Sequence, residues 1–171
     1  MKWQVIIPLF FLAVSLSACY PAPQDVDAEV VEQEINETTN TFIDAFNKGD
    51  NEIIGGLYTT DAMLMPPDTG IIEGRDAIEK FWQQIFAMGA DSISLENMDV
   101  APHLLEAWVT GSGVIYNTEG DKLDEIKYII GWQRVGEDWK IHRDIWNSSM
   151  PAPESPMEEP GMEASAEQET M

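Results

Sequence analysis

The chain has 171 residues, which fits the range of about 100–200 residues for one domain, and 44% of them are hydrophobic. Nine Lys and Arg stand against 31 Asp and Glu, giving a formal charge of −22. This charge argues against a nucleic-acid partner and against adsorption to an anionic lipid surface, because both need a basic face. The single cysteine, Cys19, excludes an internal disulfide and a thiolate metal site.

The first nineteen residues have the layout of a secretory signal. Lys2 gives a positive start, and the apolar stretch Val5–Val14 that follows is too short to span a bilayer as a helix. Residues 16–19, Leu-Ser-Ala-Cys, resemble the lipobox of bacterial lipoprotein precursors. An ordinary secretory signal that happens to end near a cysteine is the alternative interpretation.

The lipobox resemblance implies that residues 1–18 are a signal peptide that is removed. Cys19 then carries acyl chains that hold the protein on a membrane, and residues 19–27 form a short tether. Because Tyr20 follows the cysteine, the resemblance further implies the cell envelope and, in a Gram-negative cell, the outer membrane facing the periplasm.

Three helices are predicted in the first part of the mature chain. Apolar residues recur at helical spacing over residues 31–46, and this helix ends at Gly49. Asp50 can cap a second, short helix that runs over residues 53–58. A third helix with one apolar side follows Gly74.

The rest of the domain reads as strands. A short strand, Ala62–Met65, ends at two prolines. The later runs are residues 92–100, 105–116, 126–135 and 139–146, with hairpin turns at 117–121 and 136–138. Helices followed by strands predict an α+β fold, with three N-terminal helices packed on a curved, mostly antiparallel sheet. The domain covers residues 28–150, and residues 151–171 are a Pro- and Glu-rich acidic tail predicted to be disordered.

Four short motifs occur in a recognisable order: Phe46–Asp50 (FNKGD), Leu57–Ala62 (LYTTDA), Glu73–Trp82 (EGRDAIEKFW) and the closing hairpin Gly136–Asp144. Together they resemble the ketosteroid isomerase-like superfamily, which includes nuclear transport factor two and the SnoaL-type polyketide cyclases. The resemblance covers residues from about 30 to 149 and is greatest to the SnoaL-like branch. It implies a cone-shaped fold with a cavity between helices and sheet, and a homodimer.

The same resemblance shows which isomerase groups are missing. Ketosteroid isomerases use a carboxylate base, a tyrosine and a protonated aspartic acid. These positions fall on or near Pro66, Phe42 and Ile130, and none of the three side chains can exchange a proton. We therefore do not expect the isomerase mechanism.

Polar chemistry remains on the last predicted strand. Strand alternation places His142 and Asp144 on one face, together with Trp146, and a histidine tuned by a carboxylate is a candidate general base. The alternative is that both are satisfied by backbone groups and tyrosine hydroxyls and serve only the fold. The candidate ligand contacts are aromatic: Tyr58, Trp82, Tyr128, Trp132 and Trp146.

Three functions remain open. The first is a lipid-anchored module that binds a small apolar or amphipathic molecule in the cone. The second is a SnoaL-type enzyme that uses His142 or Asp144 on a carbonyl-containing molecule, and the third is a dimeric interaction scaffold. The missing isomerase groups favour the first. We expect no cofactor and no metal, because the two histidines, His103 and His142, lack the spacing of a zinc site.

Overall fold

The computed structural model describes residues 27–151. The predicted signal peptide, Cys19 and the tail beyond residue 151 lie outside this range. Within the range, no helix combines the length and the apolar content needed to cross a membrane.

Three helices precede the long strands. Helix α1 (Ala28–Phe46) and helix α2 (Asn51–Gly56) both begin at an aspartate that caps the helix. In α2 the cap is Asp50, as predicted, and its carboxylate accepts a 3.0 Å hydrogen bond from the backbone N–H of Ile53. Helix α3 (Arg75–Ala87) follows Gly74, whose φ of 85° favours glycine.

A six-stranded sheet makes up the rest of the domain. Its strands are β1 (Tyr58–Met65), β2 (Ile72–Glu73), β3 (Ala90–His103), β4 (Glu106–Asn117), β5 (Lys122–Val135) and β6 (Asp138–Ser148). Their order across the sheet is β2-β1-β6-β5-β4-β3, and every neighbouring pair is antiparallel except β1 and β6. The predicted α+β fold with a mostly antiparallel sheet is confirmed.

The second predicted helix is too long. Leu57 caps the end of α2, and Tyr58 is the first residue of β1 rather than part of the helix. The reason lies far away in sequence, because the backbone of Tyr58 pairs with Ile141 of β6. Arg75 adds a second constraint, since its guanidinium donates two hydrogen bonds, of 3.1 and 2.7 Å, to the carbonyl oxygen of Tyr58.

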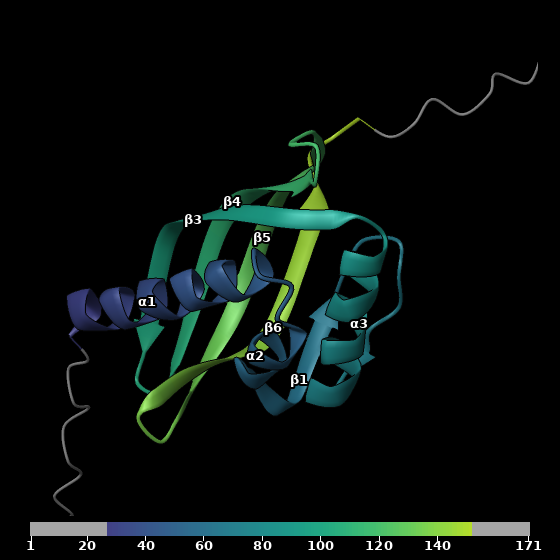
Figure 1. Cartoon of the computed structure of the whole chain (residues 1–171). Coiled ribbons are helices and arrows are strands. Elements are labelled where there is room, and N and C mark those ends of the chain that lie inside the picture. Colours follow the sequence, from purple (N-terminus) through teal and green to yellow (C-terminus); the bar gives the residue numbers. More distant parts are fainter. Residues whose placement is uncertain (1–26, 152–171) are drawn as a thin grey trace, which may run out of the picture.

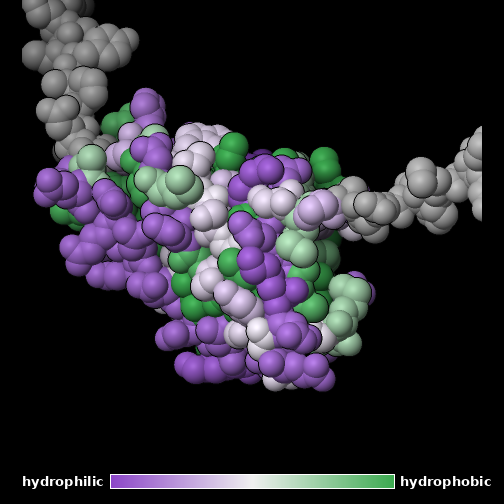
Figure 2. All heavy atoms as spheres, turned by 90° about the horizontal axis from the view of Figure 1, so that it is seen from above, coloured by the Kyte–Doolittle hydropathy of each residue, from purple (hydrophilic) through white to green (hydrophobic). Residues whose placement is uncertain are grey.

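The helices cover one side of the curved sheet. Helix α1 runs across the long strands, whereas α3 lies beside β1 (Figure 1). Their apolar sides meet the inner face of the sheet, where Ile35, Phe46 and Ile78 are completely buried. Hydrophilic side chains make up much of the outer surface seen in Figure 2, with hydrophobic groups scattered between them.

An irregularity in strand pairing changes which way the residues of β6 face. Gly131 of β5 pairs with Arg143, but the next residue, Trp132, pairs with Ile141, so His142 is an extra residue in β6. Such a bulge bends the strand and reverses the alternation of its side chains beyond it. Ile141 and Asp144 are therefore both buried although they are three residues apart.

Gly111 of β4 leaves no room for a side chain beside Glu96 of β3 and Tyr128 of β5. A Cβ added at this position would lie 2.2 Å from Cζ of Tyr128 and 2.4 Å from the carbonyl oxygen of Glu96. Both distances are far below van der Waals contact, so glycine is required here for space rather than for its backbone angles.

Candidate functional site

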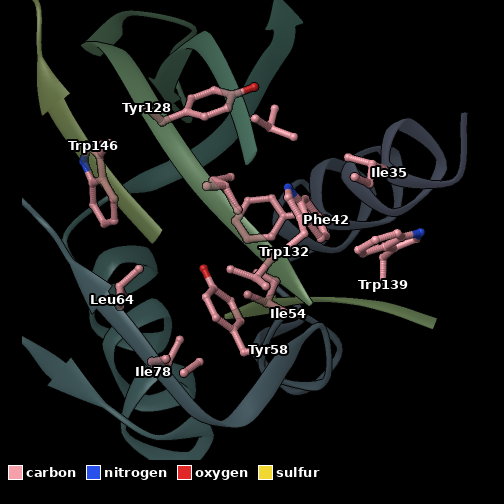
Figure 3. Close-up of a cluster of buried hydrophobic side chains, with 14 of the residues drawn as sticks. Ile35, Phe42, Ile54, Tyr58, Leu64, Ile78, Tyr128, Trp132, Trp139 and Trp146 are labelled. Atoms are coloured by element: carbon pink, nitrogen blue, oxygen red, sulfur yellow. The ribbon is translucent and has the colours of Figure 1, made fainter. Parts of the chain in front are cut away.

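The sheet and the helices enclose a small apolar cavity with a volume of about 40 Å³. It is lined by Thr39, Phe42, Trp82, Ile93, Leu95, Ile115, Ile126, Tyr128, Ile130, Trp132, Ile141, Asp144 and Trp146. Figure 3 shows Tyr128, Trp132 and Trp146 directed into the space between sheet and helices. Since a buried water needs roughly 10–15 Å³ by this measure, the cavity has room for a few waters or for one small chemical group.

Asp144 is the one carboxyl group that lines this cavity within residues 27–151. It is 6% exposed, and its Oδ2 accepts a 2.7 Å hydrogen bond from the hydroxyl of Tyr58. Burial raises the pKa of Asp144 to about 6, although the hydrogen bond from Tyr58 acts in the opposite direction. Burial and the nearby carboxyl also raise the pKa of Tyr58, so the tyrosine stays protonated. Near neutral pH, Asp144 is thus a carboxyl group that can either accept or donate a proton.

Aromatic rings surround the carboxyl group. Trp82 stacks on Trp146, with ring centroids 5.8 Å apart and planes inclined by 17°. Phe42 and Trp82 form a T-shaped pair with ring centroids 5.5 Å apart. The indole N–H groups of Trp82 and Trp132 are buried and have no hydrogen-bond partner among the described residues. The N–H of Trp82 is near the Tyr58 hydroxyl and acts to lower its pKa, yet it does not reach hydrogen-bonding geometry.

A polar chain closes one wall of the cavity. The hydroxyl of Tyr128 donates a 2.7 Å hydrogen bond to Oδ1 of Asn97, and the amide of Asn97 donates to Asn36 and Thr39 at 2.8 and 3.0 Å. These bonds join β5 and β3 to α1. The sequence analysis did not identify Asn97. The only sign of its role was that a polar residue occurs in a strand whose residues alternate between inward and outward positions.

An apolar groove adjoins the cavity and has a volume of about 320 Å³. Its lining consists of Pro66, Pro67, Thr69, Phe81, Trp82, Ile85, Met88, Ala90, Ile115, Leu123, Asp124 and Trp146. Three of these residues, Trp82, Ile115 and Trp146, also line the cavity. They therefore form the boundary between the outer groove and the inner cavity.

His142 lies outside the cavity. Its Nδ1 is 2.9 Å from Oγ1 of Thr59 and 3.7 Å from Oδ1 of Asp61. It borders a separate small pocket beside Trp108 and Gly131. The prediction that His142 and Asp144 share one face of the strand is wrong, because the bulge at His142 breaks the alternation on which the prediction depended.

The predicted ligand contacts are partly brought together. Trp82, Tyr128, Trp132 and Trp146 all line the cavity. Tyr58 instead lies behind Asp144, fully buried, and reaches the site only through its hydrogen bond. Whether any of the five contacts a ligand stays a prediction.

The three residues that the resemblance places at the isomerase positions are apolar, and the structure places all three at the cavity or the groove. Phe42 and Ile130 line the cavity, and Pro66 lines the groove. No group of three or more potential metal ligands occurs within residues 27–151.

The geometry defines a class: a cone-shaped α+β domain with one buried acid in an apolar cavity. A family model described as a SnoaL-like domain matches residues 39–141, and the chain therefore belongs to the SnoaL-like domain family. A comparison with curated protein sequences gives no match.

Solved structures agree with this fold. A ketosteroid isomerase-like protein from Erwinia carotovora atroseptica is 18% identical, with a TM-score of 0.60 over 70% of this chain and 96% of that one. An NTF2-like protein of unknown function from Pseudomonas putida is 16% identical, with a TM-score of 0.60 over 69% of this chain and 86% of that one. A protein of unknown function with a cystatin-like fold from Nostoc punctiforme is 16% identical, with a TM-score of 0.63 over 71% and 95%. At these identities the likeness concerns the fold alone.

Proposed function

We propose that the domain binds a small apolar or amphipathic molecule, with Asp144 as its polar contact. The observation that carries this proposal is a lone carboxyl group in an otherwise apolar cavity that adjoins an apolar groove. Pockets of this kind, mostly apolar with few polar groups, are typical of small-molecule sites, which usually measure about 300–1,000 Å³. The groove has this size and the cavity does not. The body of the ligand therefore lies in the groove, and only a small group passes Trp82 and Trp146.

A bulky side chain in the groove should abolish binding. We expect a neutral fluorescent probe, N-phenyl-1-naphthylamine, to bind saturably to the domain. Ala90→Trp should raise its Kd by at least about tenfold, because Ala90 lines the groove. Ala101→Trp is the matched control, since Ala101 is an exposed residue of the same strand. Equal Kd values for the two folded variants would place the binding site elsewhere.

A second candidate function is a SnoaL-type enzyme acting on a carbonyl-containing small molecule. Asp144 favours it, because a cavity carboxyl with a pKa of about 6 is poised for proton transfer near neutral pH. His142 takes no part in this version, since it lies outside the cavity. Exchange of α-protons of small ketones in D₂O, followed by NMR, tests the idea. Asp144→Asn should abolish the exchange and His142→Asn should leave it unchanged. If the exchange is no faster than in buffer alone, the hypothesis of an enzyme fails.

We also propose that the protein is a lipoprotein of the cell envelope, anchored through Cys19 and facing the periplasm from the outer membrane in a Gram-negative host. The Leu-Ser-Ala-Cys sequence at residues 16–19 supports this proposal. The full-length Cys19→Ala variant should appear unprocessed or in the soluble fraction, as seen by fractionation and mass spectrometry. Unchanged membrane retention of Cys19→Ala would contradict the anchor.

The outer face of the sheet supports the proposal of a homodimer. Trp108, Ile129 and Ile145 lie on neighbouring strands there and are 50%, 47% and 38% exposed. Apolar side chains gathered on one sheet face are typical of an interaction surface. Ile129→Glu should convert the dimer to a monomer in analytical ultracentrifugation. Ile71→Glu, at a 59% exposed position outside this face, is the control. A wild-type protein that sediments as a monomer would refute the dimer.

A further inference from the structure

The turn between β3 and β4 carries two leucines that the domain does not bury. Leu104 and Leu105 are 48% and 65% exposed, and Val135 of the neighbouring strand β5 is 50% exposed. The backbone N–H of Arg134 donates a 2.8 Å hydrogen bond to the carbonyl oxygen of Leu105, so β5 runs beside the turn at this point. Leu104, Leu105 and Val135 together are called the turn patch below.

The backbone of Leu104 indicates that its side chain is not selected for the fold. Its φ is 50°, a left-handed conformation that glycine or asparagine adopts at a lower cost than leucine. A side chain that is half exposed recovers little of this cost through packing. A costly backbone conformation that carries an exposed apolar side chain points to a contact with something outside the domain.

The turn patch lies at the end of the domain where the chain arrives from Cys19. Arg134 pairs with Glu34 of α1, and the indole of Trp139 donates a 2.9 Å hydrogen bond to the same carboxylate. These contacts join the patch to the first half of α1, which starts at Ala28. The start of α1 and the β5–β6 hairpin lie on the left of Figure 1, away from the β4–β5 turn at the top. The chain from Cys19 to Ala28 can span at most about 30 Å.

We propose that the turn patch enters the bilayer that holds the acyl chains of Cys19, and thereby sets how the domain is oriented on the membrane. This inference rests on the proposed lipid anchor and adds the surface with which the domain meets the lipid. Three side chains are too few to hold a protein on a membrane by themselves. An anchor within about 30 Å keeps them at a high effective concentration beside the lipid, so a weak contact suffices.

The charges beside the turn patch determine which lipid it meets. Glu106 directly follows the leucines, Glu137 and Asp138 lie in the neighbouring hairpin, and all three are exposed. The nearby Arg134 is already paired with Glu34. Acidic groups are repelled by an anionic surface, so the contact is with zwitterionic phospholipid and depends on the burial of apolar side chains.

The full-length lipidated protein in phosphatidylcholine vesicles tests the proposal. Acylation blocks the sulfur of Cys19, so a single introduced cysteine can be labelled with the fluorophore NBD. Val135→Cys places the label in the patch, and Glu119→Cys places it in the exposed turn at the other end of β4 as the control. Doxyl-labelled phosphatidylcholine should quench the label at position 135 at least about twofold more than the label at position 119, because inserted apolar surface lies about 5–10 Å deep.

Two variants separate the membrane contact from folding. Leu104→Gly removes the side chain and suits the φ of 50°, and Leu104→Asn tolerates the same backbone with a polar side chain. Both should leave the Tm nearly unchanged. In the protein labelled at position 135, both should bring the quenching close to that at position 119. Unchanged quenching in both variants would overturn the proposal, because Leu104 would then take no part in the contact.

The remaining outcomes separate this inference from the proposed anchor. If the protein with Cys19 intact does not stay with the vesicles, the anchor fails and the inference fails with it. If the protein stays but the labels at positions 135 and 119 are quenched equally, the anchor stands and the turn patch is left to a protein partner. Quenching at position 135 that appears only with anionic phosphatidylglycerol would make the contact electrostatic and would also overturn the proposal.

Discussion

Gly111→Ala is expected to destabilise the domain by about 3 kcal/mol, the upper part of the range for overpacked interiors. The new methyl group would lie 2.2 Å from Cζ of Tyr128 and 2.4 Å from the carbonyl oxygen of Glu96. A side chain can rotate away, but the carbonyl belongs to β3, whose backbone pairs with Ser112 of β4. The two strands would have to separate locally. Urea unfolding followed by circular dichroism measures the change.

A matched glycine provides the control for this experiment. A Cβ added at Gly56, the last residue of α2, meets no atom within 4 Å. Gly56→Ala should therefore leave the free energy of unfolding within about 1 kcal/mol of the wild type, or raise it slightly through the unfolded state. If Gly111→Ala were as mild as Gly56→Ala, the close approach of β3, β4 and Tyr128 would be wrong.

Asp144→Asn is expected to stabilise the folded domain at pH 8 and to have no such effect near pH 4. Burial raises the pKa of Asp144 from 3.8 to about 6. The folded state thus binds this proton more tightly than the unfolded state, and the free energy of unfolding falls as pH rises between these two values. The full penalty above pH 6 is about 3 kcal/mol, since each unit corresponds to about 1.4 kcal/mol. Asparagine is uncharged and still accepts a hydrogen bond from Tyr58.

The measurement is the difference in unfolding free energy between Asp144→Asn and the wild type across pH 4 to 8. The difference between the two proteins is used because Glu34 and Asp61 change the free energy of unfolding with pH in the opposite sense to Asp144. Hydrogen bonds from Arg134 and Trp139 hold the pKa of Glu34 below its usual range, and a hydrogen bond from Thr59 does the same for Asp61. Their contributions are lost as pH falls, in both proteins alike. A difference that does not change with pH would show that Asp144 is not buried as a titrating acid.

The parts of the fold that depend on residues close together in the sequence could be predicted from the sequence. The cap at Asp50 and the glycine before α3 are local signals, and both are confirmed. Tyr58 shows the limit of such signals, because its position fits the spacing of a helix as well as the start of a strand. Its pairing with Ile141 and its bond to Asp144, 86 residues away, decide between them. No local pattern contains that information.

The candidate site was only half predictable for a similar reason. Asp144 and four aromatic residues were identified because strand and helix periodicity places them inward. His142 was misplaced because strict alternation ignores bulges. A sign was present in the sequence: the apolar residues Ile141 and Trp146 are five apart, and two inward positions on a regular strand are separated by an even number. The small volume of the cavity depends on how the aromatic rings pack, which no spacing rule gives.

The place of β6 in the sheet also governs when the domain can fold. Among the strands of residues 27–151 it is the last to be synthesised, yet it lies between β1 and β5 and pairs with both. A chain still lacking residues 138–148 has two separate sheet fragments, each with an open edge that could pair with another chain. Contacts between such distant segments also slow folding. The domain therefore completes its sheet only after residues 138–148 have been synthesised, and interruption before that point leaves an intermediate with two open sheet edges that favour aggregation.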